Sequence, residues 1–249
     1  MINEIREVLQ GKGIKGKEEQ RKEVTITENG VHSIEPDEGY TLSGVGVNVS
    51  VEDIVTKLTN DEIVEYSNDN ITQLPQSLFY SKKKLQKISL ANCRTIKNSV
   101  FYGCENLISV HFPNLETLDS NSFQNCHILP EACFPKLKGT VTTRSFCNDR
   151  TLNKIDLGYV TQITGAAVFF ATSSLETLIL RSPTLCTLTG TDTFGNKGLA
   201  DGTGYIYVPK VLEDGSDGVE TYSSATNWSV YAGQFRAIED YPEITGGII

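Results

Sequence analysis

The chain has 249 residues, of which 39% are hydrophobic and 21% are charged, a balance typical of a globular protein. Its 22 basic and 31 acidic side chains give a net charge of −9, which argues against nucleic acid or an anionic membrane as a partner, because both attract basic surfaces. No stretch approaches the ~20 apolar residues that a membrane-spanning helix needs.

The N-terminal residues do not fit a secretory signal. Glu4, Arg6 and Glu7 stand where an apolar signal core is required. We therefore expect the protein to stay in the cytoplasm where it is made, or to leave by a route other than ordinary secretion.

Residues 1–22 are predicted to form a short helix followed by a flexible linker. Apolar residues within 1–10 recur at helical spacing. Gly11, Gly13 and Gly16 then interrupt the pattern and match G-x-G-x-x-G by letter. The dinucleotide-binding motif follows a strand and opens a helix, a context that is missing here, so we expect no nucleotide cofactor.

Residues 23–51 are predicted to form a small β-module. Val24 and Ile26 alternate with polar residues, Asn29-Gly30 signals a tight hairpin turn, and valines alternate from 45 to 51. The line VTITENGVHSIEPDEGYTLSGVGVNVSV resembles a module common in tail and baseplate proteins of bacteriophages of Gram-positive hosts. The resemblance implies a role in attachment and oligomerisation.

Residues 52–70 are predicted to be a linker. It holds a helical turn near residues 52–58 and ends in a degenerate repeat.

Residues 71–208 repeat with a period of 22 to 23 residues. LQKISLANCRTIKNSVFYGCEN begins at Leu85 and LISVHFPNLETLDSNSFQNC begins at Leu107, with apolar residues at matching places. Such a period with L-x-x-I-x-L is typical of a leucine-rich-repeat solenoid, in which each repeat must stack on its neighbours. One phenylalanine per repeat is predicted to form a ladder in the core: Phe79, Phe101, Phe123, Phe146, Phe169 and Phe194.

These lines resemble the BspA-like class of leucine-rich repeats, which reads L-x-x-I-x-I-P and later A-F-x-x-C-x-x-L. Pro113 keeps the proline, whereas Ala91 replaces it one repeat earlier, and Pro130, Gly139 and Gly165 mark irregular repeats. The resemblance implies a β-rich solenoid with the N-terminal β-module at one end and a capping helix at the other.

Alternate residues of each repeat strand are predicted to face outward. Because solenoids often bind partners on such a face, we take this row as the candidate binding face, with a plain solvated face as the open alternative. The row is mixed in charge and offers no Trp or Tyr platform for a sugar. It comprises Lys87, Ser89, Ser109, His111, Glu131, Lys154, Asp156 and Thr177, with Cys133 and Ile179 beside them.

Residues 209–249 are predicted to cap the solenoid, because its last coil would otherwise expose apolar core. Apolar residues from Tyr222 to Phe235 have near-helical spacing, and Trp228 is expected to cover the open end. The segment from Tyr205 to Tyr231 resembles the closing segment of BspA-like repeats. Residues 214–218 lack the oxygen spacing of a calcium loop, so we expect a surface turn.

No catalytic or metal-binding set is recognisable in the sequence. Cys126 and His127 are neighbours, which places their side chains on opposite faces of an extended segment. No G-x-S-x-G or C-x-x-C motif is present. Cys104 and Cys126 recur with the repeat and are expected to be buried thiols. We therefore expect a non-enzymatic protein without metal or cofactor.

Two functions remain open. The first is a structural protein of a phage virion, made in the host cytoplasm: a tail-fibre or baseplate component whose residues 1–51 contact other tail proteins. Its repeats would bind a host-surface protein or polysaccharide, and it would be a homo-oligomer, with a trimer as first expectation. The second is a bacterial cell-surface adhesin or interaction protein of the BspA type. The resemblance of residues 23–51 and the absence of a signal peptide favour the virion.

Overall fold

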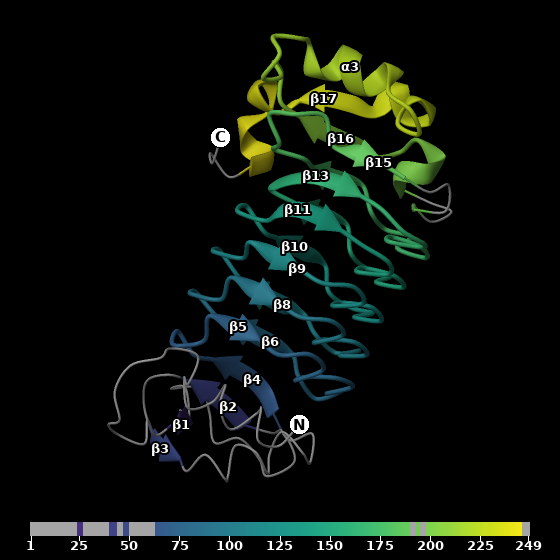
Figure 1. The fold of residues 1–249 in the computed structure, drawn as a ribbon. Helices are drawn as coiled ribbons and strands as arrows, with labels where there is room; N and C mark the ends of the chain where they lie inside the picture. The colour runs from purple at the N-terminus through teal and green to yellow at the C-terminus, as the bar shows by residue number, and fades with distance from the viewer. Residues whose placement is uncertain are drawn as a thin grey trace.

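The computed structural model describes residues 24–26, 40–43, 47–49, 63–189, 193–194 and 198–245. From residue 63 onward the chain winds into a β-solenoid, in which successive coils stack along one axis (Figure 1). The helix expected within 1–22, the Asn29-Gly30 turn and the helical turn expected at 52–58 lie outside the described residues.

One side of the solenoid is a parallel β-surface with one strand per coil, which we call the first sheet surface. Lys87 pairs with Ser109, and Lys154 pairs with Thr177, in equivalent registers. The residue that follows Lys87 or Lys154 in its strand points inward, and Ile88 and Ile155 are accordingly buried. Its strands are β4 (Ile63–Ser67), β6 (Lys87–Ser89), β8 (Ser109–His111), β10 (Glu131–Cys133), β12 (Lys154–Asp156), β14 (Thr177–Ile179), β16 (Tyr205–Val208) and β17 (Phe235–Ala237).

The hydrogen-bond pattern of the first sheet surface changes between β8 and β10. In successive coils, the residue that immediately precedes the strand donates its backbone N–H to a backbone carbonyl group of the preceding coil. Gln86 donates to Val64 O at 2.7 Å, Ile108 to Gln86 O at 2.8 Å, and Asn153 to Pro130 O at 2.8 Å. Pro130 occupies this position ahead of β10 and has no N–H to donate. The surface accordingly consists of two hydrogen-bonded sheets, with the strand orders β3-β1-β2-β4-β6-β8 and β10-β12-β14-β16-β17.

A second parallel β-surface lies across the core from the first. Thr95 pairs with Thr117, and Gln162 pairs with Thr187, so outward polar residues recur from coil to coil. Its strands are β5 (Gln73–Leu74), β7 (Thr95–Ile96), β9 (Thr117–Leu118), β11 (Lys138–Val141), β13 (Tyr159–Ile163) and β15 (Thr187–Leu188).

The third side of each coil consists of two consecutive tight turns. Backbone hydrogen bonds in these turns link one coil to the next. The N–H of Phe101 donates to Ser122 O at 2.8 Å, and the N–H of Phe123 donates to Ser145 O at 2.9 Å. Because these amides are buried with their side chains, the bonds satisfy groups that would otherwise be costly to desolvate. Residues with positive φ flank each phenylalanine from Phe79 to Phe169 and make the sharp bends; they include Ser77, Ser81, Ser99, Gly103, Asn121, Asn125, Arg144 and Asn148.

The six phenylalanines form one continuous column through the core. Consecutive ring centroids lie 5.1–5.6 Å apart, with interplanar angles of 2–18°. Tyr66 extends the column at one end, 5.3 Å from Phe79, and Trp228 at the other, 6.1 Å from Phe194. Burial of each side chain contributes roughly 1.5–3 kcal/mol, and stacking adds to it.

The solenoid begins earlier than the boundary at residue 71. β4 pairs with β6, and Ile63 and Tyr66 precede Leu85 and Ile88 by one repeat, so the first coil starts within the predicted linker 52–70. The N-terminal strands continue the same sheet: β1 (Val24–Ile26) pairs antiparallel with β2 (Tyr40–Ser43) and β3 (Val47–Val49), and β2 runs parallel to β4. The β-module therefore adjoins the first coil directly.

The C-terminal cap is more divided than a single helix. After η1 (Gly198–Asp201) and β16, α3 covers Gly218–Ser224, η2 covers Ser229–Gln234, and the chain then forms β17, η3 (Ile238–Asp240) and η4 (Pro242–Thr245). The helix expected over Tyr222–Phe235 is therefore wrong in its second half, where Phe235 joins a strand. Trp228 is fully buried between these elements, and its Nε1–H donates to Cys186 O at 2.6 Å.

Phe123→Ala removes a ring from the middle of the column. We expect a loss of about 3–5 kcal/mol in the free energy of unfolding, the usual result of a cavity left by a buried phenylalanine. Denaturant titration measures it. Phe170→Ala is the matched control, because Phe170 is 46% exposed next to buried Phe169, and its effect should stay within about 0.5 kcal/mol. Equal effects would contradict the column.

Truncation before Val219 removes most of α3, Trp228 and β17. The edge of β16 and the last phenylalanine ring would lose their cover, and exposed strand edges promote association. We expect oligomers of undefined size by light scattering. A monodisperse truncated chain with a cooperative unfolding transition would show that the cap is dispensable.

Candidate functional site

The candidate binding face predicted from the sequence is only partly exposed. Lys87, Ser109, His111 and Glu131 are exposed, and the Lys87 Nζ lies 2.6 Å from Glu65 Oε1. Ser89, Lys154 and Thr177 are half-buried, and Asp156 is buried. The open part of the face therefore lies over β4 to β10.

Asp156 does not belong to an exposed binding face. It is 1% exposed and forms an ion pair with Arg181, whose Nη2 lies 2.7 Å and whose Nε lies 3.0 Å from Asp156 Oδ2. The N–H of Gly158 donates to Asp156 Oδ1 at 2.9 Å. A buried carboxylate requires such a paired, hydrogen-bonded environment. Asp156 is in register with exposed Cys133 on β10, but unlike Cys133 it is buried.

Residues 238–245, which we call the strap, cover the C-terminal part of the first sheet surface. Ile238 is buried against Ile179 and Tyr207, and Tyr241 and Ile244 pack against the same cluster. In Figure 1 the strap is the yellow segment beside β16 and β17. The strap explains why Ile179, an outward residue of β14, is not exposed.

Sequence reasoning missed the tyrosines at the end of the outward rows. Tyr205 pairs with Thr177 and Tyr207 with Ile179, so both continue the rows by one coil. Tyr205 is 43% exposed, and the Arg236 guanidinium carbon lies 4.4 Å from the centre of its ring. The step from β14 to β16 is longer than in the other coils, which hides this continuation in the sequence. The statement that the face lacks an aromatic residue is therefore wrong at its C-terminal end.

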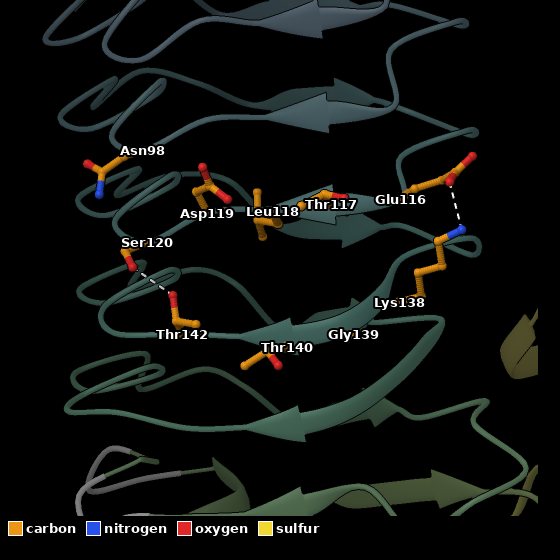
Figure 2. Close-up of a pocket in the computed structure, with 10 residues that line it drawn as sticks. All are labelled: Asn98, Glu116, Thr117, Leu118, Asp119, Ser120, Lys138, Gly139, Thr140 and Thr142. Carbon is orange, nitrogen blue, oxygen red and sulfur yellow. Dashed lines mark hydrogen bonds and ion pairs between the residues drawn. The ribbon is translucent and has the colours of Figure 1, made fainter.

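The second sheet surface carries a groove of about 610 Å³ over β9 and β11 (Figure 2). At one end, the Glu116 carboxylate lies 2.6 Å from Arg94 Nη1 and 2.7 Å from Lys138 Nζ. Hydrogen bonds and charge from Lys138 and Arg94 hold the pKa of Glu116 below its ordinary value. The carboxylate is thus a fixed negative group at the groove edge. The groove is lined by Asn98, Glu116, Thr117, Leu118, Asp119, Ser120, Lys138, Gly139, Thr140 and Thr142.

The floor of this groove is rich in hydroxyl groups and lacks a large side chain. Ser120 Oγ and Thr142 Oγ1 are hydrogen-bonded at 2.7 Å across two coils. Gly139 has φ +77°, and a Cβ built there would have no atom within 4 Å. The pairing register of β11 with β13 also shifts between Gly139 and Thr140. Gly139 thus lies at an irregularity of the strand, while Thr140 pairs with Gln162 and continues the row of outward side chains.

A buried carboxyl group at Asp149 belongs to the core and not to either surface. It occupies the repeat position of Cys104, Cys126 and Thr172, where Cys104 Sγ and Thr172 Oγ1 donate to Phe carbonyls one coil earlier, at 3.0 and 2.7 Å. Asp149 Oδ1 accepts from the Cys126 N–H at 2.7 Å, whereas its buried Oδ2 has no partner among the described residues. Burial raises the pKa of Asp149 well above its ordinary value. The equivalent acceptor for a protonated Oδ2–H would be the Phe123 carbonyl.

The other candidates for chemistry are dispersed. His127 Nε2 lies 3.2 Å from Asn148 Nδ2, and His111 is exposed on β8. Cys133 is exposed as a residue, but its thiol is partly desolvated. This desolvation raises the pKa of the thiol to about 11, which opposes a nucleophilic role. Within the described part of the chain, no three His, Cys, Asp or Glu residues gather as a metal site. Cys104 and Cys126 are buried and take part in no disulfide.

Asp149→Thr introduces the residue type that the next coil has at the equivalent position, Thr172. The pKa of the Asp149 carboxyl is higher in the folded state than in the unfolded state. Its contribution to stability is therefore fully present below the unfolded pKa and is lost as the pH rises through the folded pKa. The substitution should therefore raise the free energy of unfolding at pH 7–8 by about 1–3 kcal/mol, the cost of an unsatisfied buried polar group, and should flatten its pH dependence. Denaturant titrations from pH 5 to 8 measure this.

Glu176→Thr is the control for Asp149→Thr, because it removes an exposed carboxylate. Its pH dependence should match that of the unmodified chain. A lower stability of Asp149→Thr at pH 7–8 would contradict the assignment of Asp149 as a protonated core residue.

Comparisons with known proteins point to one repeat family. The family model described as BspA type leucine rich repeat region matches residues 70–199 in six copies. No curated protein matches the chain. A leucine-rich repeat protein from Bacteroides ovatus ATCC 8483 aligns with a TM-score of 0.34 and 12% identity over 75% of this chain and 70% of its own. The T. pallidum leucine-rich repeat protein aligns with a TM-score of 0.30 and 15% identity, over 64% and 91% respectively.

The helices of the described residues are all short. None of them has the length and apolar character that crossing a bilayer requires.

Proposed function

This chain belongs to the BspA-type leucine-rich-repeat family, and we propose that it is the host-attachment component of a bacteriophage tail. Its repeat region is an adhesin-like interaction domain, a class of solenoid that typically serves as a non-catalytic scaffold. The resemblance of residues 23–51 to tail and baseplate modules supports the virion assignment. A bacterial surface adhesin of the BspA type is the second candidate, and the family membership supports it.

The groove over β9 and β11 carries the proposal of host binding. Its hydroxyl groups and ionised Glu116 can donate to and accept from a polyhydroxylated ligand, and the open space beside Gly139 leaves room for one. The net charge of −9 opposes binding of polyanions. We therefore propose that the ligand is a neutral polysaccharide of the host surface, lying across the coils.

The N-terminal β-module suits the attachment end of this assembly. In the described sheet order, β3 is the outermost strand next to β1, and an outer strand can pair with another chain. We propose that residues 1–51 contact other tail proteins or further copies of this chain, with a trimer as the first expectation. Light scattering on the full chain measures this assembly.

Binding of the full chain to purified neutral wall polysaccharides of Gram-positive bacteria tests the groove. Thr117→Arg places a long cationic side chain in the groove and should weaken binding at least about tenfold, or ~1.4 kcal/mol. Thr187→Arg is the matched control, since Thr187 is an exposed outward threonine of β15 on the same surface, outside the groove. Equal loss in both variants, or binding only to proteins, would reject the groove as a polysaccharide site.

Competition for phage adsorption separates the two candidate functions. If the protein is the attachment component of a tail, the soluble full chain should lower the adsorption of the corresponding phage to the cells it binds. Thr117→Arg should lose this effect. Cell binding without any effect on phage adsorption would favour the adhesin.

A further inference from the structure

The strap has a regular chemical pattern of its own. Its sequence, IEDYPEIT, places Ile238, Tyr241 and Ile244 at every third position, and acidic residues stand between them. The apolar side chains face the sheet, whereas Glu239, Asp240 and Glu243 are exposed. The strap therefore presents an apolar side to the solenoid and an acidic side to solvent.

Side chains, rather than a backbone ladder, hold the strap in place. The Tyr241 ring packs on Tyr207 with centroids 5.6 Å apart at 73°. The Tyr241 and Ile244 N–H groups donate to Ile238 O and Tyr241 O within the strap. Such a segment can leave its site without breaking the hydrogen bonds of the sheet beneath it.

Basic groups around the strap complement its acidic residues. The Lys210 N–H donates to Glu239 Oε2 at 2.8 Å, and Lys210 Nζ lies 2.8 Å from Asp240 Oδ1. Arg236 lies next to Tyr205 on the same side of the sheet. Charges of this kind select an acidic segment over a basic one.

The surface that the strap occupies continues beyond its described end. Ile244 and Thr245 form one wall of a cavity of about 290 Å³. The other walls come from β8, β10, β12 and their flanking residues: Ile108, Ser109, Val110, Pro130, Glu131, Ala132, Cys133, Lys154 and Asp156. Ile108 is 39% exposed there. This cavity can accept a further apolar side chain in line with those of the strap.

We propose that the strap is an internal ligand of a peptide-binding face on the first sheet surface. The face binds an acidic protein segment with apolar residues at every third position, and the strap occupies its C-terminal half when no such segment is bound. The partner segment displaces the strap and reaches into the cavity over β8 and β10. This site is separate from the groove over β9 and β11, so it stands whether or not that groove binds polysaccharide.

Cys133 is a natural reporter for this face. It lines the cavity together with Ile244 and Thr245, and it is exposed, whereas Cys93, Cys104, Cys126, Cys147 and Cys186 are buried. The rate at which a thiol reagent labels Cys133 in the native full chain therefore measures how far the strap covers the cavity. Cys133→Ser identifies the labelling phase that belongs to this residue.

The first experiment loosens the strap in the full chain. Ile244→Asp places a charge in its apolar side and should speed the labelling of Cys133 severalfold. Asp240→Lys breaks the ion pair between Asp240 and Lys210 Nζ from the side of the strap and should act in the same direction, which keeps the test valid if Ile244→Asp folds poorly. Val230→Asp, at a 77% exposed position of the cap, is the matched control and should leave the rate unchanged.

The second experiment adds the synthetic peptide IEDYPEIT to the Ile244→Asp chain, or to the Asp240→Lys chain, in which Lys210 stays available to the peptide. The peptide should bind, measured by fluorescence anisotropy, and should slow Cys133 labelling again, whereas IKKYPKIT should not. It should bind the unmodified chain more weakly, because the strap competes with it. Binding of neither peptide to a chain with accelerated labelling would show that the strap is only a structural cover. Concentration-dependent dimers without peptide binding would also overturn the proposal, since the strap would then be exchanged between copies.

Discussion

Every coil of this protein depends on its neighbours through one shared contact, the phenylalanine and its own amide. The ring of Phe123 stacks on Phe101 and Phe146, while its N–H donates to Ser145 O in the next coil. A single coil could neither bury the ring nor satisfy the amide. The period of 22 to 23 residues follows from this pair of requirements, because both must recur at the same place in every coil.

The repeat specifies hydrogen-bonding positions more strictly than it specifies residue types. Cys126 and Thr172 both donate to a phenylalanine carbonyl one coil earlier, although a thiol and a hydroxyl differ in size and polarity. Asp149 places a carboxyl group there, whose Oδ2 has no partner among the described residues and whose pKa is raised by burial. Pro130 shows the opposite case, in which the missing N–H interrupts the first sheet surface while the phenylalanine column continues. The core therefore tolerates irregular repeats that a sequence pattern alone marks as degenerate.

Features set by local spacing could be predicted from the sequence, and features set by distant segments could not. The phase of the phenylalanines and the inward direction of Ile88 follow from the period, and the same phase would have placed Ile63 and Tyr66 in the first coil. The pairing of buried Asp156 with Arg181, and the covering of Ile179 by a segment near the C-terminus, join parts of the chain that no local pattern connects. The groove at Gly139 depends on a register shift that the letters of the sequence do not reveal.

The two sheet surfaces differ because, among the described residues, the strap covers part of the first surface. The second surface keeps its outward threonines exposed or half-buried from β7 to β15 and carries cross-coil ion pairs from β7 to β11, so its polar groups reach solvent. The first surface becomes apolar toward β14 and β16, where Ile179 and Tyr207 would form an exposed patch without the strap. Exposed apolar patches of this kind mark interaction sites or promote aggregation. A strap that is held by side chains shields this apolar patch. It can also leave the patch without breaking the hydrogen bonds of the strands beneath it.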